Sequence, residues 1–249
     1  MQFSDALSIA RSGRALVFLG SGFSLGAVSI SDQRIPKTAE LARRLMKAAG
    51  EDEEAEFDLA ADLFIRVNLH NPTALNQFLE KQFSVKQISS AQENIARYPW
   101  GRVYTTNYDN IYEIAAKRCG ADFISASWQN PPSQYSDTNK WVVHLHGYIG
   151  DVAKSGTRNP FLIGRKSYIE LELLKTQWPT QLQVDLAKAS AIFVVGFSFS
   201  DIHIARLFRV SKTLKRKTFV IVHPSENTAS KSYAAAQRSP HFRRGRRFG

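Results

Sequence analysis

The sequence predicts an α/β fold whose core is a parallel β-sheet. Short continuous apolar runs, such as Ala15–Leu19 and Ala191–Val195, are typical of strands buried on both faces, as central parallel strands are. Four strand-like segments, far apart in the chain, each pass directly into a glycine-rich or polar turn. Because the carboxyl ends of parallel strands meet at one edge of a sheet, we expect these four turns to gather where open α/β sheets bind nucleotides.

The four turns hold the candidate functional residues. In chain order they are Gly20-Ser21-Gly22-Phe23-Ser24, Thr105-Thr106-Asn107-Tyr108-Asp109, His144-Leu145-His146-Gly147 and Gly196-Phe197-Ser198-Phe199-Ser200-Asp201. In the first turn, the glycines permit a tight bend and a close approach of the backbone to a ligand, and the amides beyond them can point at a pyrophosphate. A glycine-rich turn between a strand and a helix, with no ligand, is the alternative.

A mostly helical stretch follows the first turn and interrupts the α/β alternation. Apolar residues recur at helical spacing in Lys37–Ala49, Glu53–Val67 and Pro72–Phe83, and less regularly in Val85–Tyr98. The third segment opens with a proline, as helices often do. We interpret residues from about 44 to 98 as an inserted helical module that packs over the nucleotide site.

The second turn follows a β-branched and aromatic run, Arg102–Thr106, which predicts a strand that ends at Asn107. Asp109 is expected to cap the next helix, whose apolar positions 111, 114 and 115 face inward. Capping and turn chemistry is the ordinary role of such residues. It remains an alternative to ligand binding, above all for Asp109.

The third turn carries two histidines. The alternation of Trp141–Gly147 places His144 and His146 on the same face of a predicted strand. A paired-histidine metal site is conceivable, but no third ligand with suitable spacing lies nearby, so we expect no metal. His146 stands at the strand end before a glycine and can reach the cleft, whereas His144 is deeper and is expected to be packed or hydrogen-bonded.

The fourth turn ends the last central strand, Ala191–Val195. Asp201 is expected to cap a helix that runs through Phe208. Three further elements are expected in this half of the chain: helices near Arg165–Lys175 and Pro179–Lys188, and a final strand at Thr218–Val222 that is followed by His223.

Composition restricts the class of protein. With 249 residues, 43% of them hydrophobic and 22% charged, the chain is typical of a globular protein. The apolar runs are too short to cross a bilayer, and the amino terminus has no signal-like segment, so we expect a cytoplasmic location and no membrane contact. The single cysteine, Cys119, excludes an intrachain disulfide and a zinc site of four cysteines.

The net charge of +11 is concentrated near the carboxyl end. Ser211–Gly249 contains ten Lys or Arg and one acid, Glu226, so nine of the eleven excess charges lie there. The remaining 210 residues are nearly neutral, and we expect nucleic-acid contact only through the tail. Residues 226–249 are predicted to be a basic tail that is flexible or leads into a further region. A solvated tail and a tail that touches nucleic acid or an acidic partner both remain open.

The four turns, in this order, resemble the motifs of the sirtuin superfamily: GAG-x-S, T-Q-N-x-D, H-G and G-T/S-S. Together they span about 180 of the 249 residues, which makes a chance match of all four much harder than a match of one. The resemblance implies a Rossmann-like NAD-binding and NAD-hydrolysing domain over residues 1–225, with NAD⁺ as substrate.

The resemblance also implies a role for each motif residue. Asn107 would lie beside the nicotinamide ribose, where it would hold a ribose hydroxyl or orient the attacking water, and His146 would be the catalytic base. The implied nucleotide-binding residues are Gly20, Ser21, Gly22, Phe23, Ser24, Thr106, Asp109, Gly196, Ser198 and His223.

Three departures from the superfamily pattern narrow the implied activity. The chain lacks the cysteines of the zinc module, Arg34-Ile35-Pro36 keeps only part of Gly-Ile-Pro-x-Phe-Arg, and His223 stands where an asparagine is common. In this the chain resembles the zinc-free sirtuin-like domains of bacterial antiphage defence, which implies hydrolysis of NAD⁺ to ADP-ribose and nicotinamide. We expect such activity to depend on homo-oligomerisation or on a partner domain or subunit.

Three other functions stay open at this point. The chain could be an NAD-dependent protein deacylase, which needs an open channel for an acyl-lysine. It could be a sensor that binds NAD or ADP-ribose derivatives without turning them over. It could also be a scaffold whose basic tail binds nucleic acid.

Overall fold

The computed structural model describes residues 1–134, 140–155, 160–164, 177–209 and 212–221. The predicted helix near Arg165–Lys175, His223 and the basic tail at 226–249 lie outside the described residues. In the part of the chain that is described, no helix combines the length and the apolar character needed to cross a bilayer.

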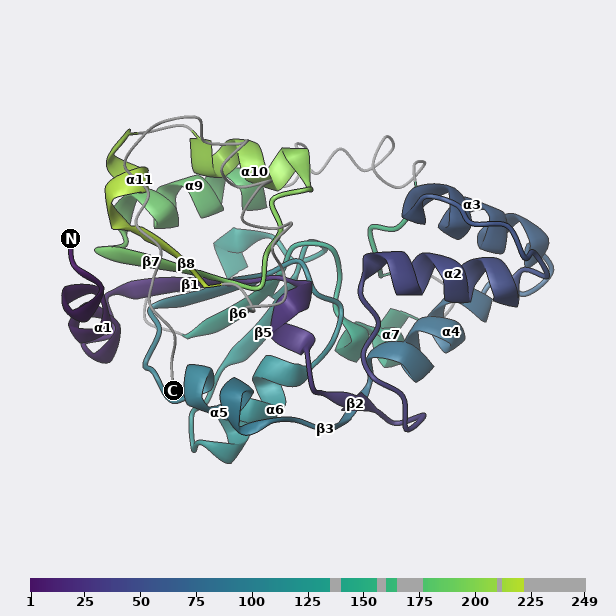
Figure 1. The fold of residues 1–249 in the computed structure, drawn as a ribbon, viewed down its shortest axis with the longest axis horizontal. Helices are drawn as coiled ribbons and strands as arrows, with labels where there is room; N and C mark the ends of the chain where they lie inside the picture. Colours follow the sequence, from purple (N-terminus) through teal and green to yellow (C-terminus); the bar gives the residue numbers. More distant parts are fainter. Residues whose placement is uncertain (135–139, 156–159, 165–176, 210–211, 222–249) are drawn as a thin grey trace.

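Six parallel strands form the central sheet, in the order β5-β6-β4-β1-β7-β8 (Figure 1). They are β1 (Ala15–Leu19), β4 (Arg102–Thr105), β5 (Ile124–Ser127), β6 (Trp141–His144), β7 (Ala191–Val195) and β8 (Thr218–Ile221). Each neighbouring pair runs parallel, which confirms the predicted fold class. From β1 the chain passes to β4 on one side and later crosses to β7 on the other, so a topological switch point lies between β1 and β7.

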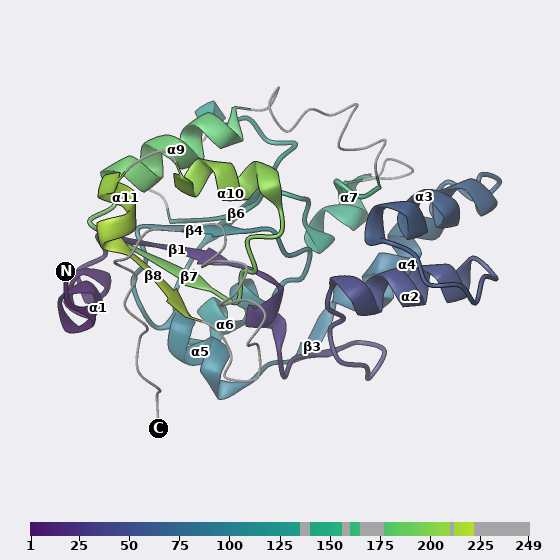
Figure 2. The ribbon, with the colours of Figure 1, turned by 45° about the horizontal axis from the view of Figure 1, so that its top comes forward.

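Both faces of the sheet are buried, as the continuous apolar runs predict. Ala15, Val17 and Leu19 of β1 belong to one hydrophobic core, whereas Leu16 and Phe18 belong to the other. The first core is covered by α1 (Phe3–Arg11), α5 (Ser90–Ala96) and α6 (Ile111–Arg118), and the second by α9 (Trp178–Lys188), α10 (Ile202–Arg209) and α11 (Lys212–Lys217). Figure 2 shows the three late helices together on one face and α5 and α6 on the other.

Three helices lie to one side of the sheet and form a helical module (Figure 1, right). They are α2 (Thr38–Ala48), α3 (Phe57–Val67) and α4 (Ala74–Phe83). All three confirm predicted helices, although α3 begins at Phe57 rather than Glu53. Thr73 is the N-cap of α4, so Pro72 precedes the helix instead of opening it.

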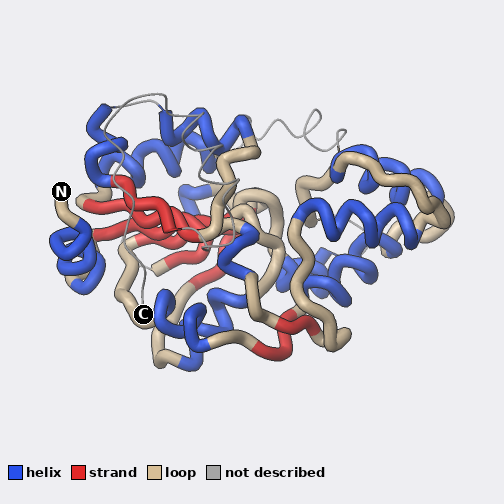
Figure 3. The backbone as a smooth tube through the Cα atoms, in the orientation of Figure 1, coloured by secondary structure: helices blue, strands red, loops and turns tan. Residues whose placement is uncertain are grey.

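The predicted helix Val85–Tyr98 is wrong in its first part. Val85–Gln87 is a short strand, β3, which pairs antiparallel with β2 (Val28–Ser29), and this ribbon links the module to the sheet domain (Figure 3). The helix in this region is α5, which starts after Ser89, where the side chains of Ser89 and Gln92 form a capping box. Since α5 packs beside α6, the region from about 44 to 98 divides between the helical module and the layer that covers the sheet.

The other predicted elements within the described residues agree with the structure. The helix predicted at Pro179–Lys188 is α9, the helix capped by Asp201 is α10, and β8 covers the final strand up to Ile221. One of the basic residues near the carboxyl end has a structural role, because Lys217 Nζ donates a hydrogen bond of 2.8 Å to the carbonyl of Ala187 at the end of α9. Positive charge at a helix carboxyl terminus is stabilising. After α7 (Val152–Ser155) and before α9, residues 160–164 pack against the third turn.

Candidate functional site

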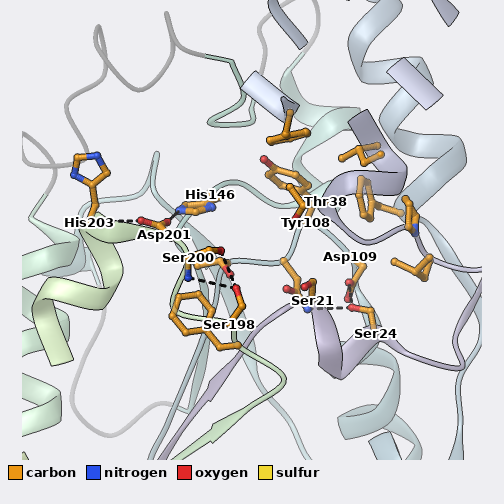
Figure 4. Close-up of a pocket in the computed structure, with 18 residues that line it drawn as sticks. Ser21, Ser24, Thr38, Tyr108, Asp109, His146, Ser198, Ser200, Asp201 and His203 are labelled. Carbon is orange, nitrogen blue, oxygen red and sulfur yellow. Dashed lines mark hydrogen bonds and ion pairs between the residues drawn. The ribbon is translucent and has the colours of Figure 1, made fainter. Parts of the chain in front are cut away.

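A cavity of about 370 Å³ lies at the carboxyl edge of the sheet, beside the switch point and under the helical module (Figure 4). All four predicted turns contribute to its lining. They supply Ser21, Ser24, Thr106, Asn107, Tyr108, Asp109, His146, Phe197, Ser198, Ser200, Asp201 and, from the first turn of α10, His203. The module and the segment before it supply Ile35, Pro36, Thr38, Leu41, Phe57 and Phe83. The expected convergence of the four turns is therefore present, with a polar wall from the sheet edge and a mainly apolar wall from the module.

The glycines of the first and fourth turns pack against each other. The amide of Gly20 donates to Val195 O at 2.9 Å, and the amide of Gly22 donates to Gly196 O at 2.8 Å. Gly196 has φ of +65°, and a Cβ there would lie 2.4 Å from the carbonyl carbon of Gly22. These three glycines are absent from the cavity lining, so the close approach that they permit is between two turns at the switch point.

The amides of the first turn differ from the sequence-based expectation. The Phe23 amide donates to Gly20 O at 2.9 Å, so the amides of Gly22 and Phe23 are both engaged within the protein. The expectation that the amides beyond the glycines point at a pyrophosphate is wrong for the Phe23 amide. The Phe23 ring is buried and packs toward Tyr112, at a centroid distance of 6.5 Å, so this side chain belongs to the core.

A hydrogen-bonded chain joins the first two turns. Asn107 Nδ2 donates to Gly20 O at 2.9 Å and to Ser24 Oγ at 3.0 Å, and Ser24 Oγ donates to Asp109 Oδ2 at 2.6 Å. A carbonyl oxygen only accepts, which assigns the amide nitrogen of Asn107 to the side facing Gly20. Since both amide hydrogens are used, the carboxamide oxygen is the atom of Asn107 that can accept a bond from a ligand.

Asp109 is buried and acts on the cavity mainly through Ser24. Its Oδ1 accepts the amide of Ile111, the first residue of α6, at 3.2 Å, but the N-cap of α6 is Asn110, so the predicted cap is one residue off. Burial raises the pKa of Asp109 to about 6, although its hydrogen bonds with Ser24 and the Ile111 amide oppose the rise. The carboxyl group therefore titrates close to neutral pH.

The two histidines of the third turn have different partners. His144 is buried, with Nδ1 2.9 Å from Asn107 O and Nε2 2.8 Å from Glu113 Oε1. Both partners can only accept, so both ring nitrogens donate and His144 is an imidazolium. Burial lowers the pKa of His144, but the attraction of Glu113 and the hydrogen bonds outweigh it, and the pKa is raised. The prediction of a packed, hydrogen-bonded His144 is confirmed.

These contacts also bear on the metal alternative. A metal ion on His144 would have to displace Asn107 O or Glu113 from one ring nitrogen. Within the described residues, no group of three or more His, Cys, Asp or Glu side chains is arranged to hold a metal ion.

His146 faces the cavity and is paired with Asp201. Its Nε2 lies 3.1 Å from Asp201 Oδ2 (Figure 4). The other carboxylate oxygen of Asp201 accepts the amides of His203 at 2.9 Å and Ile204 at 3.1 Å, which confirms the predicted cap of α10. Burial raises the pKa of Asp201, but His146 and the two amides outweigh it, so the pKa is lowered and the carboxylate stays ionised. The sequence signalled the cap but not the pairing with His146.

In the fourth turn, Phe199 has a left-handed backbone conformation and lies between two exposed serines. Phe199 has φ of 59°, which is uncommon for a bulky side chain, and its ring packs against Phe197 and Phe208 at centroid distances of 4.9 Å and 5.6 Å. Burial of this ring holds the strained turn. On either side of it, the exposed Ser198 and Ser200 join their hydroxyls at 2.8 Å.

Several lining residues were missed in the sequence. The Tyr108 hydroxyl donates to Leu162 O at 2.9 Å, and the ring packs between Phe83 and Phe161, which ties the second turn to the module. Thr38, at the start of α2, also lines the cavity (Figure 4). Only their place beside predicted turns and helices could have signalled these residues, because their types are common in cores and at helix starts.

The parallel sheet, its switch point and the polar cavity define a Rossmann-like α/β protein. A family model described as SIR2-like domain matches residues 101–242, more than half of the chain, and the chain therefore belongs to the SIR2-like family, a family of NAD-related enzymes. A solved structure from "Structural Basis for the Mechanism and Regulation of Sir2 Enzymes" is similar, with 17% identity over 96% of this chain and 98% of that chain, at a TM-score of 0.46. No curated protein matches the chain.

Proposed function

We propose that this protein is an NAD⁺ glycohydrolase, which cleaves NAD⁺ to ADP-ribose and nicotinamide. The observation that carries the proposal is a single cavity that contains both the carboxamide of Asn107 and the imidazole of His146, with an ionised carboxylate beside the imidazole. Membership of the SIR2-like family supports NAD⁺ as the substrate. The cavity volume of about 370 Å³ is in the range of small-molecule sites.

The proposed reaction needs little acid catalysis. Water attacks C1′ of the nicotinamide ribose, the bond from C1′ to the pyridinium nitrogen breaks, and its electron pair stays on nicotinamide, which leaves as a neutral molecule. His146 takes the proton of the attacking water. The carboxamide oxygen of Asn107 accepts a hydrogen bond from that water or from a ribose hydroxyl, since its nitrogen is held by Gly20 and Ser24.

The phosphates and ribose of NAD⁺ need polar partners that the cavity supplies mainly as hydroxyls. Ser21, Thr106, Ser198 and Ser200 are at least partly exposed, and all four line the cavity. Because the amides of Gly22 and Phe23 are engaged elsewhere, we assign phosphate binding to these hydroxyls rather than to those amides. Gly20, Gly22 and Gly196 contribute by shaping the wall.

The test is release of free nicotinamide from NAD⁺ in the absence of any acylated peptide. Asn107→Ala and His146→Ala are each expected to reduce the rate by about 10²- to 10⁴-fold, because a positioned base or orienting group contributes that much. Matched controls are Asn94→Ala in α5 and His70→Ala between α3 and α4, both exposed and away from the cavity lining. Equal rates for the site variants and their controls would overturn the assignment.

Two other outcomes separate the competing functions. Nicotinamide release that requires an acyl-lysine peptide would identify a deacylase, although the chain has a single cysteine and so lacks the four of a zinc module. Tight binding of NAD⁺ with no release would identify a sensor.

The biological role follows from the same chemistry and from the resemblance to antiphage effectors. We propose that the protein depletes NAD⁺ as a defence effector and that its activity depends on homo-oligomerisation or on a partner domain or subunit. Size-exclusion chromatography of the active protein tests the second part, because a strictly monomeric and fully constitutive enzyme contradicts it.

A further inference from the structure

We infer that His144 is the positioning residue of Asn107: paired with Glu113 as a cation, it donates from Nδ1 to the Asn107 carbonyl and so fixes the carboxamide that lines the cavity. The part of this inference that concerns catalysis rests on the proposed function. The part that concerns the hydrogens of His144 does not, because the two acceptors beside the ring set them.

The main-chain and amide groups of Asn107 all have partners within the protein. Its main-chain amide donates to Thr105 Oγ1 at 2.9 Å, and Nδ2 donates to Gly20 O at 2.9 Å and to Ser24 Oγ at 3.0 Å. Its carbonyl accepts from His144 Nδ1 at 2.9 Å. Of these four partners only the imidazolium is charged, and hydrogen bonds with a charged partner are the stronger ones. The carbonyl is thus the firmest anchor of Asn107.

The imidazole of His144 is oriented by three separate elements. The residue ends β6, which pairs with β4 on one side and β5 on the other. Its Nε2 lies 2.8 Å from Glu113 Oε1 on α6, and this oxygen also accepts Ser125 Oγ of β5 at 2.9 Å. The ring of Tyr148 lies over the imidazole at a centroid distance of 4.2 Å. The direction of Nδ1 is therefore set before any ligand arrives.

The hold on Asn107 depends on the charge of His144. A cationic imidazole carries hydrogen on both nitrogens and satisfies both acceptors, whereas a neutral one carries a single hydrogen. Since a carboxylate is a stronger acceptor than a carbonyl, that hydrogen then belongs on Nε2, toward Glu113. The Asn107 carbonyl is left facing the lone pair of Nδ1, so loss of the proton releases the main chain of Asn107.

The groups around His144 favour the cation. Burial lowers the pKa of His144, but Glu113 on α6 and the bond to the Asn107 carbonyl outweigh it, and the pKa is raised above 6.5. The charge of Asp109 in the second turn adds to the rise. Tyr148, whose own pKa is raised by burial, stays neutral in this range. The hold on Asn107 is therefore complete below pH 6.5 and is lost as pH rises through the folded pKa.

The first test is the pH profile of nicotinamide release. In the wild-type protein we expect kcat to fall by about 10- to 100-fold on the alkaline side with KM nearly unchanged, which is the usual effect of losing an outer partner. In Glu113→Gln the new amide can donate to Nε2, so a neutral His144 keeps its hydrogen on Nδ1, toward Asn107, and the alkaline fall should disappear. Glu93→Gln, which removes a carboxylate paired with Arg118 between α5 and α6, is the control and should keep the wild-type profile. A Glu113→Gln protein that keeps the alkaline fall would overturn the inference.

The second test is a pH titration of the wild-type protein followed by ¹⁵N spectroscopy, with the signals assigned along the chain. Below pH 6.5 both ring nitrogens of His144 are expected to carry hydrogen, and the side-chain amide signals of Asn107 should shift together with the ring as it loses its proton. A single hydrogen on the ring there, or an Asn107 amide that does not follow it, would contradict the inference. This titration needs neither NAD⁺ nor a folded variant. The expected spectra without nicotinamide release would reject the proposed function and leave the hold of His144 on Asn107 intact.

Discussion

Replacing Asp109 by asparagine tests whether the buried carboxyl in the second turn is destabilising when ionised. Asparagine has the same shape and can still accept the Ile111 amide through its side-chain oxygen. It removes the only group at this position that titrates. The bond with Ser24 changes direction, because an amide nitrogen would have to donate to a hydroxyl that already accepts from Asn107.

The magnitude follows from the raised pKa. A pKa of about 6 in the folded protein, against 3.8 as the ordinary value, means that the folded state binds the proton more tightly than the unfolded chain. Stability from the protonated carboxyl is complete below pH 3.8 and is lost as pH rises from there through 6. The whole loss is about 3 kcal/mol, of which about 2 kcal/mol falls between pH 4 and pH 8.

The assay is urea unfolding of wild type and Asp109→Asn from pH 4 to pH 8. Groups that both proteins share cancel in the difference, so the free energy of unfolding of the variant should rise relative to wild type by about 2 kcal/mol over this range. Asp52→Asn, at an exposed position between α2 and α3, controls for the loss of one charge. A difference that stays constant with pH would refute the reasoning, whatever its sign.

The remaining predictions concern the same turns. Gly196→Ala should lower the free energy of unfolding by about 3 kcal/mol or more, because the added Cβ meets the backbone of the first turn. Gly120→Ala is the control, at a similar φ of +70° with nothing within 4 Å of the added Cβ, and should cost only about 1 kcal/mol. Equal costs would contradict the packing of the two turns. Glu113→Gln should destabilise the protein by about 2 to 3 kcal/mol near pH 6, because it leaves the His144 cation without its counter-charge. Because the pKa of His144 is raised, the stability from its ion pair with Glu113 is fully present below pH 6.5 and is lost as pH rises through the folded pKa. The difference in free energy of unfolding between wild type and Glu113→Gln, measured by chemical unfolding, should therefore shrink in alkaline solution. A difference that grows there would contradict this reasoning. Ser24→Ala should cost about 1 to 3 kcal/mol, because Oδ2 of the buried Asp109 loses its hydroxyl donor. It should also slow nicotinamide release, because Asn107 loses one of its two hydrogen-bond partners; unchanged stability and rate would contradict both roles.

The sheet and the place of the cavity were predictable because their signals are local. An apolar run such as Ala15–Leu19 needs burial on two faces, and a turn at its carboxyl end must lie at the ligand edge of a parallel sheet. The ribbon of β2 and β3 carries no such signal, since Val85–Gln87 has three residues and only one is buried. Its pairing with Val28–Ser29 is a long-range contact that no local pattern encodes.

The group that approaches each glycine could be predicted from the sequence only in part. A glycine shows that something approaches the backbone closely, but not what approaches. At Gly20, Gly22 and Gly196 the approaching group is the opposite turn. In the same way, Asp201 was recognisable as a helix cap because capping is local, whereas its second oxygen lies beside a histidine from the turn after β6, far away in the sequence.

The two histidines of the third turn differ in their partners, although they lie only two positions apart in the sequence. His144 lies between a carbonyl and a carboxylate, so both of its nitrogens donate and no lone pair is left to accept a proton. His146 instead lines the cavity, and its Nε2 lies 3.1 Å from the carboxylate of Asp201. His144 still contributes, because it holds the main chain of Asn107 in place from behind. Two histidines two positions apart at a strand end thus differ in role, one a buried cation and the other the proposed base. Exchanging Glu113 for glutamine should weaken the first role without creating a second base in the cavity, since His144 is not among the lining residues.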